Sequence, residues 1–531
     1  MSHKLIKSTE KKKLQKVNSA EIVAKSVIEY VVAVWGIALC VFVPLYLKNG
    51  YYSVGTAKYE VYKNIFVIGL IALVILSAVW LMMKERFTKP EMTITDRCVC
   101  VFLIESVIAA VVGGNFKECL NGYNGWYMGL FALFSFGVLY YFFSHFGQHS
   151  KWVLIFLCIA SMIAYVIGIL HRLLIDVIGT YEGIADVYKT QFLSTLGQAT
   201  WYSSFVCTVF PLGVALFWCA KKTWQRIVSG IFVLAGFCTI FTQNSDSAYI
   251  ALAGFMLVFF WFSACSAVRM ERFVEIVLLL LLATRLMNLA FRIYPNPILI
   301  FDTYSKLMLF HPMMWGVFVL ALVLWAVSLL CAKKKIDFSK GGKVLRAVIL
   351  GGVIAVVFSI ILILVLGYYE KLPGTIRAVT DSVPYLIWKD SWGNGRGGTW
   401  SISWQMFWDM DVVHKLFGVG PDGYAPYAYS FYQERLGQLW GERTLTNAHN
   451  EWLNAAINYG IIGASAYIGI FITAIRQFVK NWSENPMLIG FAACVVSYMC
   501  HNFFCYQQVC CTPFMFIIIG AGIYITRKKG A

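Results

Sequence analysis

The stretch "TLTNAHNEWLNAAINYGIIGASAYIG", residues 444–469, passes from a polar loop into an apolar helix. Thr446 or Asn447 can cap this helix, which would put His449 and Asn450 in its first turn. The apolar run at 452–474 is long enough to cross a hydrocarbon core of about 30 Å. The fold therefore depends on how many runs of this kind the chain contains.

Apolar runs of similar length recur from one end of the chain to the other. The protein has 531 residues, of which 59% are hydrophobic and 13% charged, and its mean hydropathy is +0.69. Soluble domains have about 25% charged residues. We therefore expect an all-α polytopic membrane protein with about 14 transmembrane helices. The expected spans are 26–47, 65–83, 98–113, 126–146, 152–171, 201–219, 226–241, 248–265, 273–291, 311–331, 346–367, 452–474, 487–505 and 509–525.

The net charge of +17 does not indicate nucleic-acid binding, because its distribution follows the membrane pattern. Lys and Arg gather in alternate short loops, as the positive-inside rule requires. We expect a cytoplasmic (inner) membrane protein with both termini in the cytoplasm. The predicted divisions are a basic cytoplasmic tail at 1–25, membrane helices at 26–367, a large extracytoplasmic loop at 368–448 between helices 11 and 12, membrane helices at 449–525 and a basic tail at 526–531.

The cysteine and glycine patterns indicate neither a metal nor a cofactor. Most of the fifteen cysteines lie inside apolar runs, where cysteine behaves as a small hydrophobe. There is neither a CxxC pair nor a Walker or Rossmann glycine motif. Asp409-Met410-Asp411 spells DxD, a pair that holds a divalent metal in nucleotide-sugar transferases, but the motif is short. We predict that the protein uses no metal and no cofactor.

Two residues stand out as chemical candidates. Arg396 lies among four glycines, which let the backbone approach a bulky anion, and its guanidinium can grip a diphosphate with two parallel hydrogen bonds. At a helix start, the dipole disfavours a charged imidazole, so His449 would be neutral and able to accept a proton. The alternatives are an exposed loop arginine and a histidine that only hydrogen-bonds a loop.

Further polar residues are predicted on the same outer side. Arg285 and Arg292 are seven residues apart, on one face of a span, and Arg172 ends the fifth span. They either help to bind the diphosphate or snorkel to the membrane interface. Trp400, Asp422 and Asn450 are the candidates for acceptor or sugar binding, although Asp422 also suits a simple turn.

Three stretches together resemble the O-antigen ligase and polymerase family. They are "RGGTWSISWQMFWDMDVVHKLFGVGPDGY" (396–424), "NAHNEWLNAAINYGIIGASAYI" (447–468) and, earlier, "FLSTLGQATWYSSF" (192–205). The family shows an Arg and Trp stretch, a Gly-x-Gly turn and then His-Asn at the start of a membrane helix. The ordered set is more specific than any one of its pieces.

The resemblance implies an inverting glycosyltransferase of the GT-C membrane type whose active site faces outward. Its donor would be a glycan on undecaprenyl diphosphate in the lipid bilayer, and its acceptor a glycan or another surface molecule. His449 matches the family's base, and Arg396 matches an arginine that binds the diphosphate. One departure is "TQNSDSAYIAL" (242–252), where Asp246 stands near a second arginine of the family. The source of a second cation is therefore open.

Other functions compete with this one. Polymerase and ligase share these motifs, so the sequence leaves both open. A lipid-linked oligosaccharide flippase or another transporter also fits many spans and scattered membrane charges, but it does not need a loop of this length carrying Arg and His. A structural or sensory membrane protein is the third reading.

Overall fold

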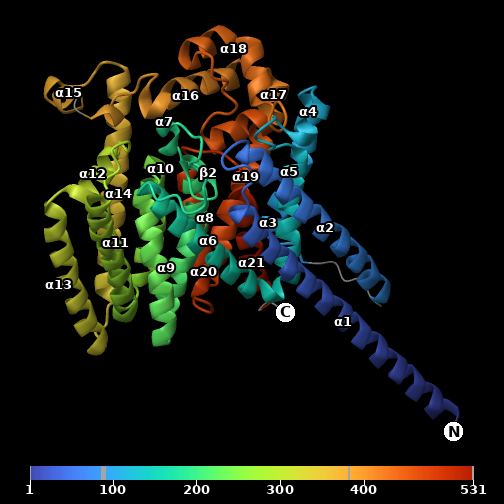
Figure 1. Cartoon of the computed structure of the whole chain (residues 1–531). Coiled ribbons are helices and arrows are strands. Elements are labelled where there is room, and N and C mark those ends of the chain that lie inside the picture. The colour runs from blue at the N-terminus through green and yellow to red at the C-terminus, as the bar shows by residue number, and fades with distance from the viewer. Residues whose placement is uncertain (1, 85–90, 381–382, 529–531) are drawn as a thin grey trace.

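The computed structural model describes residues 2–84, 91–380 and 383–528, and this part of the chain is almost wholly helical (Figure 1). The prediction of an all-α protein is confirmed. The long helices are α1 (Ser2–Leu45), α2 (Val54–Met83), α3 (Ile94–Val112), α5 (Leu130–Phe146), α6 (Ser150–Arg172), α8 (Ala199–Cys219), α9 (Thr223–Thr242), α10 (Asp246–Ser263), α11 (Ala267–Ile293), α13 (Met313–Lys333), α14 (Ser339–Tyr368), α19 (Glu451–Lys480), α20 (Met487–His501) and α21 (Thr512–Arg527).

The remaining elements connect these helices. They are α4 (Phe116–Asn121), η1 (Gly147–His149), α7 (Asp186–Lys189), β1 (Phe192–Leu193), β2 (Gly197–Gln198), α12 (Thr303–Phe310), α15 (Gly374–Thr380), η2 (Pro384–Leu386), α16 (Trp392–Asp409), α17 (Val412–Phe417) and α18 (Tyr424–Trp440). The two strands pair antiparallel, Phe192 with Gln198 and Leu193 with Gly197.

The described residues contain ten helical stretches that are long and apolar enough to cross a membrane. The expected spans 126–146 and 152–171 both overlap one of these stretches, Leu130–Arg172, and the first begins four residues before it. The expected spans 98–113, 487–505 and 509–525 lie on α3, α20 and α21, which are not among the ten. The chain is thus a multi-pass membrane protein, while the count of fourteen crossings stays a prediction.

The C-terminal helices lie inside the bundle. α19 packs against α3 and α20, α20 also packs against α8 and α10, and α21 packs against α5. By contrast, none of the residues in the most apolar window of α14 is buried, as expected for a helix that faces lipid. The central helices are rich in buried aromatic and small residues, which let them approach closely.

The segment predicted as a large loop, 368–448, is mostly helical. It contains α15, η2, α16, α17 and α18, and Figure 1 shows these elements at one end of the bundle. Both chain ends lie toward the opposite end (Figure 1). The predicted boundary at residue 25 falls inside α1, because the helix continues through the basic segment without a break. Of the C-terminal tail, residues 529–531 lie outside the described part.

Candidate active site

Asn450, and not Thr446 or Asn447, caps α19. Its Oδ1 accepts hydrogen bonds from the backbone N–H groups of Trp452 at 3.0 Å and Leu453 at 3.1 Å. These are two of the donors that a helix start leaves unsatisfied. The predictions for the cap and for the first turn are therefore wrong: His449 precedes the cap and adopts a left-handed conformation with φ 49°. The Asn447 side chain accepts the N–H of His449 at 2.9 Å and holds this turn.

The His449 ring lies between two aromatic rings. Trp440 stacks on it with ring centroids 5.9 Å apart, and Tyr506 meets it edge-on at 5.3 Å. Burial lowers the pKa of His449 to about 3, and the positive charge of Arg396 acts in the same direction. The imidazole is therefore neutral at physiological pH and can accept a proton.

Arg396 is positioned by a break in α16. Gly393, Asn394 and Gly395 all have positive φ, which interrupts the helix just before the arginine. The guanidinium donates from Nε at 3.2 Å and from Nη2 at 2.9 Å to the carbonyl oxygen of Phe504, and from Nη1 at 2.7 Å to that of Gly393. Burial lowers the pKa of Arg396, which nevertheless stays a cation.

Arg396 and His449 share one site, although 53 positions of chain separate them. The connection between α20 and α21 touches both, because Phe504 accepts from Arg396 and Tyr506 packs on His449. Trp440 makes a second link, since a Cβ built on Gly395 would lie 3.5 Å from the ring that stacks on His449. The two residues that the sequence singled out are thus brought together at the end of the bundle that carries α16–α18.

An aromatic wall borders the arginine. Trp400 lies 5.5 Å from Trp392 and 5.6 Å from both Phe503 and Phe504, measured between ring centroids. Trp400 also lines a hollow of about 280 Å³ together with Leu453 of α19. This surface suits the stacking of an apolar sugar face.

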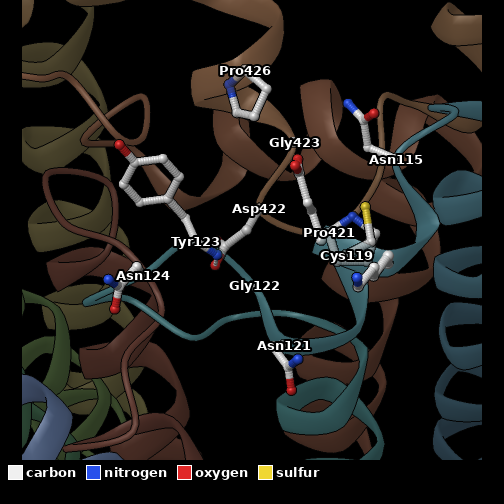
Figure 2. A pocket seen from close by; sticks show the side chains of 12 residues that line it. Asn115, Cys119, Asn121, Gly122, Tyr123, Asn124, Pro421, Asp422, Gly423 and Pro426 are labelled. Carbon is white, nitrogen blue, oxygen red and sulfur yellow. Dashed lines mark hydrogen bonds between the residues drawn. The ribbon is translucent and has the colours of Figure 1, made fainter.

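Asp422 lies apart from the imidazole, in the Gly-x-Gly turn. It has φ 54°, and its Oδ2 accepts the backbone N–H groups of Tyr123 at 2.9 Å and Met128 at 2.8 Å. Burial raises the pKa of Asp422 to about 6, and the two N–H groups oppose that rise. Asp422 therefore anchors the segment between α3 and α5, and it also lines a pocket of about 530 Å³ (Figure 2).

The other predicted arginines lie in other surroundings. Arg172 is 1% exposed and donates to the backbone oxygens of Thr190 and Thr242. Arg285 donates from Nη2 to the carbonyls of Met308 and Leu309, at 2.6 and 3.1 Å. These contacts tie helix ends together. Arg292 is exposed at the end of α11.

Carboxylates near the site also have partners. Asp246, which stands near the place of a second family arginine, accepts a hydrogen bond from the hydroxyl of Tyr385. Both of these residues are close enough to Arg396 to offset part of the lowering of its pKa. In the DxD sequence, Asp409 accepts from the hydroxyl of Tyr432 at 2.6 Å, and Asp411 caps α17.

Sequence reasoning missed the connection between α20 and α21. α20 ends at His501 and α21 begins at Thr512, so the predicted spans 487–505 and 509–525 enclosed too much of it. The signal was present in the polar residues Asn502, Gln507 and Gln508, which interrupt the apolar pattern.

A buried polar chain holds this connection in place. The Glu451 carboxylate accepts from the hydroxyls of Tyr467 at 2.6 Å and Tyr498 at 3.0 Å. It also accepts from Asn502 Nδ2 at 2.5 Å. His501 Nε2 in turn lies 2.9 Å from Ser203 Oγ. The predicted motif stretch 192–205 thereby touches the end of α20, and Trp201 Nε1 in the same stretch donates to the hydroxyl of Tyr506 in the connection at 3.4 Å.

The fold and the site define the class: a polytopic membrane protein with an arginine, a neutral histidine and an aromatic wall at one end of its helix bundle. Within that class, residues 298–468 match the family model described as O-Antigen ligase, and this match supports the resemblance to the O-antigen ligase family. The match contains Arg396, Trp400, Asp422 and His449, whereas the 192–205 stretch lies outside it. The comparison with curated proteins found no match.

Proposed function

We propose that the protein is a glycan polymerase or ligase that works on the outer face of the cytoplasmic membrane. It would transfer an oligosaccharide from undecaprenyl diphosphate to an acceptor hydroxyl, with inversion and without a metal. The family match supports an enzyme of O-antigen ligase or polymerase type and hence a lipid-linked glycan substrate in a membrane setting. The observation that carries the proposal is the meeting of Arg396 and His449 beside the same connection.

Arg396 supplies the charge that the leaving group needs. The carbonyls of Phe504 and Gly393 fix the orientation of its guanidinium before substrate arrives. A cation held in a largely desolvated place stabilises developing negative charge more than a mobile cation in water does. The diphosphate would therefore leave from beside Arg396, with its new charge compensated.

His449 acts as the general base. Its neutral ring takes the proton of the acceptor hydroxyl as the oxygen forms a bond to the anomeric carbon. The bond from that carbon to the diphosphate oxygen breaks on the opposite face, which inverts the configuration. Binding of the diphosphate would offset the charge of Arg396 and so raise the pKa of His449 from its low value, which makes the ring a better base when the donor is present.

The remaining assignments follow from their surroundings. Trp400 would stack on a sugar of the donor, and Asp422 would bind the acceptor. Asn450 would position His449, because it caps the helix that begins directly after the turn that contains this histidine. Arg292, Arg285 and Arg172 remain candidates for the second cation.

The two carboxylates of the DxD sequence already have structural partners, which agrees with a mechanism that uses no metal. Asp409 accepts a hydrogen bond from the hydroxyl of Tyr432, and Asp411 caps α17.

The experiment replaces His449 with Ala in cells that make the glycan. A transferase defect removes polymer or ligated glycan while lipid-linked units still reach the outer leaflet, because transport does not need this base. His414→Ala is the matched control, since His414 belongs to the same segment and is bonded to Asp411. Lipid-linked units stranded on the inner leaflet of the His449→Ala cells would instead indicate a flippase.

A further inference from the structure

Two hollows border the segment between α3 and α5: one faces the Gly-x-Gly turn, and the other faces α19 and the connection between α20 and α21. The outer one, the cup, has a volume of about 530 Å³, and Figure 2 shows Asn115, Asn121, Tyr123 and Asn124 around it. The inner one, the cleft, has a volume of only about 20 Å³. Asp422 lines both hollows and marks the place where they meet.

The cup has the chemistry of a site for neutral sugars. It offers three carboxamides and the phenol of Tyr123, which together can donate to hydroxyls, accept from them and stack on a sugar face. The side chains of Asn115 and Asn121 are exposed and hydrogen-bond to none of the residues that the structure describes. Lys117 offsets only one of the two carboxyl groups that line the cup, Glu118 and Asp422, so the cup disfavours an anionic sugar.

The cleft contains two buried polar atoms without partners. Asn458 Oδ1, on a residue 1% exposed, and Gln507 Nε2, on a residue 8% exposed, make no hydrogen bond of good geometry within residues 2–84, 91–380 and 383–528, although the Gln507 amide lies near the hydroxyl of Tyr467. Buried polar groups are normally paired, so each such group calls for an explanation. One is an acceptor and the other a donor, which is the pair that a single hydroxyl can satisfy. A volume of about 20 Å³ also suits a group of that size.

The cleft leads toward the imidazole. Tyr506 lines the cleft, and its ring is the one that meets His449 edge-on. Asn447 lines it as well and accepts the backbone N–H of His449. A sugar hydroxyl in the cleft would therefore lie beside Tyr506 and Asn447, the two cleft residues that contact His449 directly.

We infer that the cup and the cleft are the acceptor subsite, with one hydroxyl of the terminal acceptor sugar in the cleft and the rest of a neutral glycan in the cup. This inference rests on the proposed function. It adds Asn458 and Gln507 as specificity-determining residues, and Asn121 as a contact farther along the glycan.

The test uses the full-length protein and oligosaccharide released by mild acid from the cell's own lipid carrier. This probe keeps its sugar hydroxyls and lacks the diphosphate, so it loses the contact that we propose between the donor and Arg396, and the cleft variants report its binding as acceptor. Saturation-transfer NMR measures its binding, and transfer assays measure KM for each substrate. The variants are Asn458→Leu, Gln507→Leu and Asn121→Ala. Ser497→Ala is the control, because it removes another buried, unpartnered polar atom that does not line the cleft.

We expect Asn458→Leu and Gln507→Leu each to raise the acceptor KM by about tenfold or more, with the donor KM unchanged. The Tm should not fall, because an unpaired buried group contributes no bond to lose. Asn121→Ala changes an exposed residue, so it should weaken binding of the oligosaccharide without affecting folding. If a cleft variant folds poorly, this variant still tests whether the cup binds the glycan.

The outcomes separate the two proposals. Unchanged binding and unchanged acceptor KM in the three variants would overturn the acceptor subsite while transfer by the wild type stands. Binding that depends on Asn458 and Gln507, in a wild type that transfers nothing, would support the subsite and refute the transferase.

Discussion

At the residue scale, the account depends on the surroundings of His449. A left-handed backbone places its ring between Trp440 and Tyr506, and both burial and Arg396 keep the ring neutral. His is among the residues that tolerate this conformation best. The same arrangement that prepares a proton acceptor also makes the folded protein resist protonation there.

This resistance predicts a pH dependence of stability. The folded-state pKa of His449 is about 3, below the usual value of 6.5, so its contribution is fully present above about pH 6.5 and is lost as the pH falls toward 3. The Tm of the wild type should therefore fall more steeply between pH 7 and pH 4 than that of His449→Asn. Other histidines contribute to both proteins alike. Tm is measured by thermal unfolding in detergent at each pH. If the Tm of the two proteins changed with pH in parallel, a lowered pKa of His449 would be contradicted.

Arg396 and His449 could be predicted from the sequence because each lies in a recognisable pattern of neighbouring residues. Glycines surround Arg396, and a polar loop turns into an apolar helix at His449. Phe504, Tyr506 and Gln507 could not be placed beside Arg396 and His449 in this way, because a contact between residues far apart in the chain produces no recognisable pattern in the local sequence. The cap was misassigned because Thr446, Asn447 and Asn450 all have side chains that cap helices well.

At the element scale, α19 is shaped by a break at Gly460. Gly460 has φ 63° and ψ −175°, and just before it the carbonyls of Ile457 and Asn458 accept the N–H groups of Val419 at 3.0 Å and Gly420 at 2.9 Å. A Cβ on Gly460 would stand 2.3 Å from the Leu416 backbone. The Gly-x-Gly turn is therefore docked on α19 through backbone contacts that only glycine permits.

Gly460→Ala tests this docking. The substitution forces a side chain into a positive-φ position against backbone atoms, at a cost of about 1–3 kcal/mol. We expect a Tm several degrees lower and weaker acceptor binding, since Asp422 and Asn458 flank the docked turn. Gly437→Ala, on α18 with open space around it, is the control and should leave both unchanged. Equal Tm values for the two variants would show that the docking contributes little.

Helices of this kind are predictable as apolar runs, but their interruptions are not. The apolar runs located the long helices to within about three turns, except for the start of α1, which begins at Ser2 although the expected span begins at residue 26. The breaks in α16 at Gly393–Gly395 and in α19 at Gly460 depend on what each backbone meets in the tertiary structure. The segment 368–448 was expected to be a large loop, and it forms several helices, in which Trp400 and its neighbours pack against the aromatic side chains of the connection between α20 and α21.

At the scale of the whole molecule, one group of helices faces outward and another forms the interior of the bundle. α14 and much of α13 face outward as lipid-contacting helices, whereas α19, α20 and α21 form the interior that supports the site. Arg396 belongs to α16, and the cup is lined by residues of α4 and of the turn before α18. Figure 1 shows α4, α16, α17 and α18 at the end of the bundle away from both termini. Under the proposed function, this layout would let a donor in the bilayer and an acceptor from outside approach His449 from different directions.

The most direct test of this account is a double-mutant measurement on purified protein in liposomes with a lipid-linked repeat unit. His449→Ala and Arg396→Gln should each lower the transfer rate by roughly a hundredfold or more, and the double variant should be no slower than the slower single variant. His414→Ala and Arg435→Gln are controls from the same segment and should keep the wild-type rate. Transfer at the wild-type rate by the folded His449→Ala protein would contradict the account.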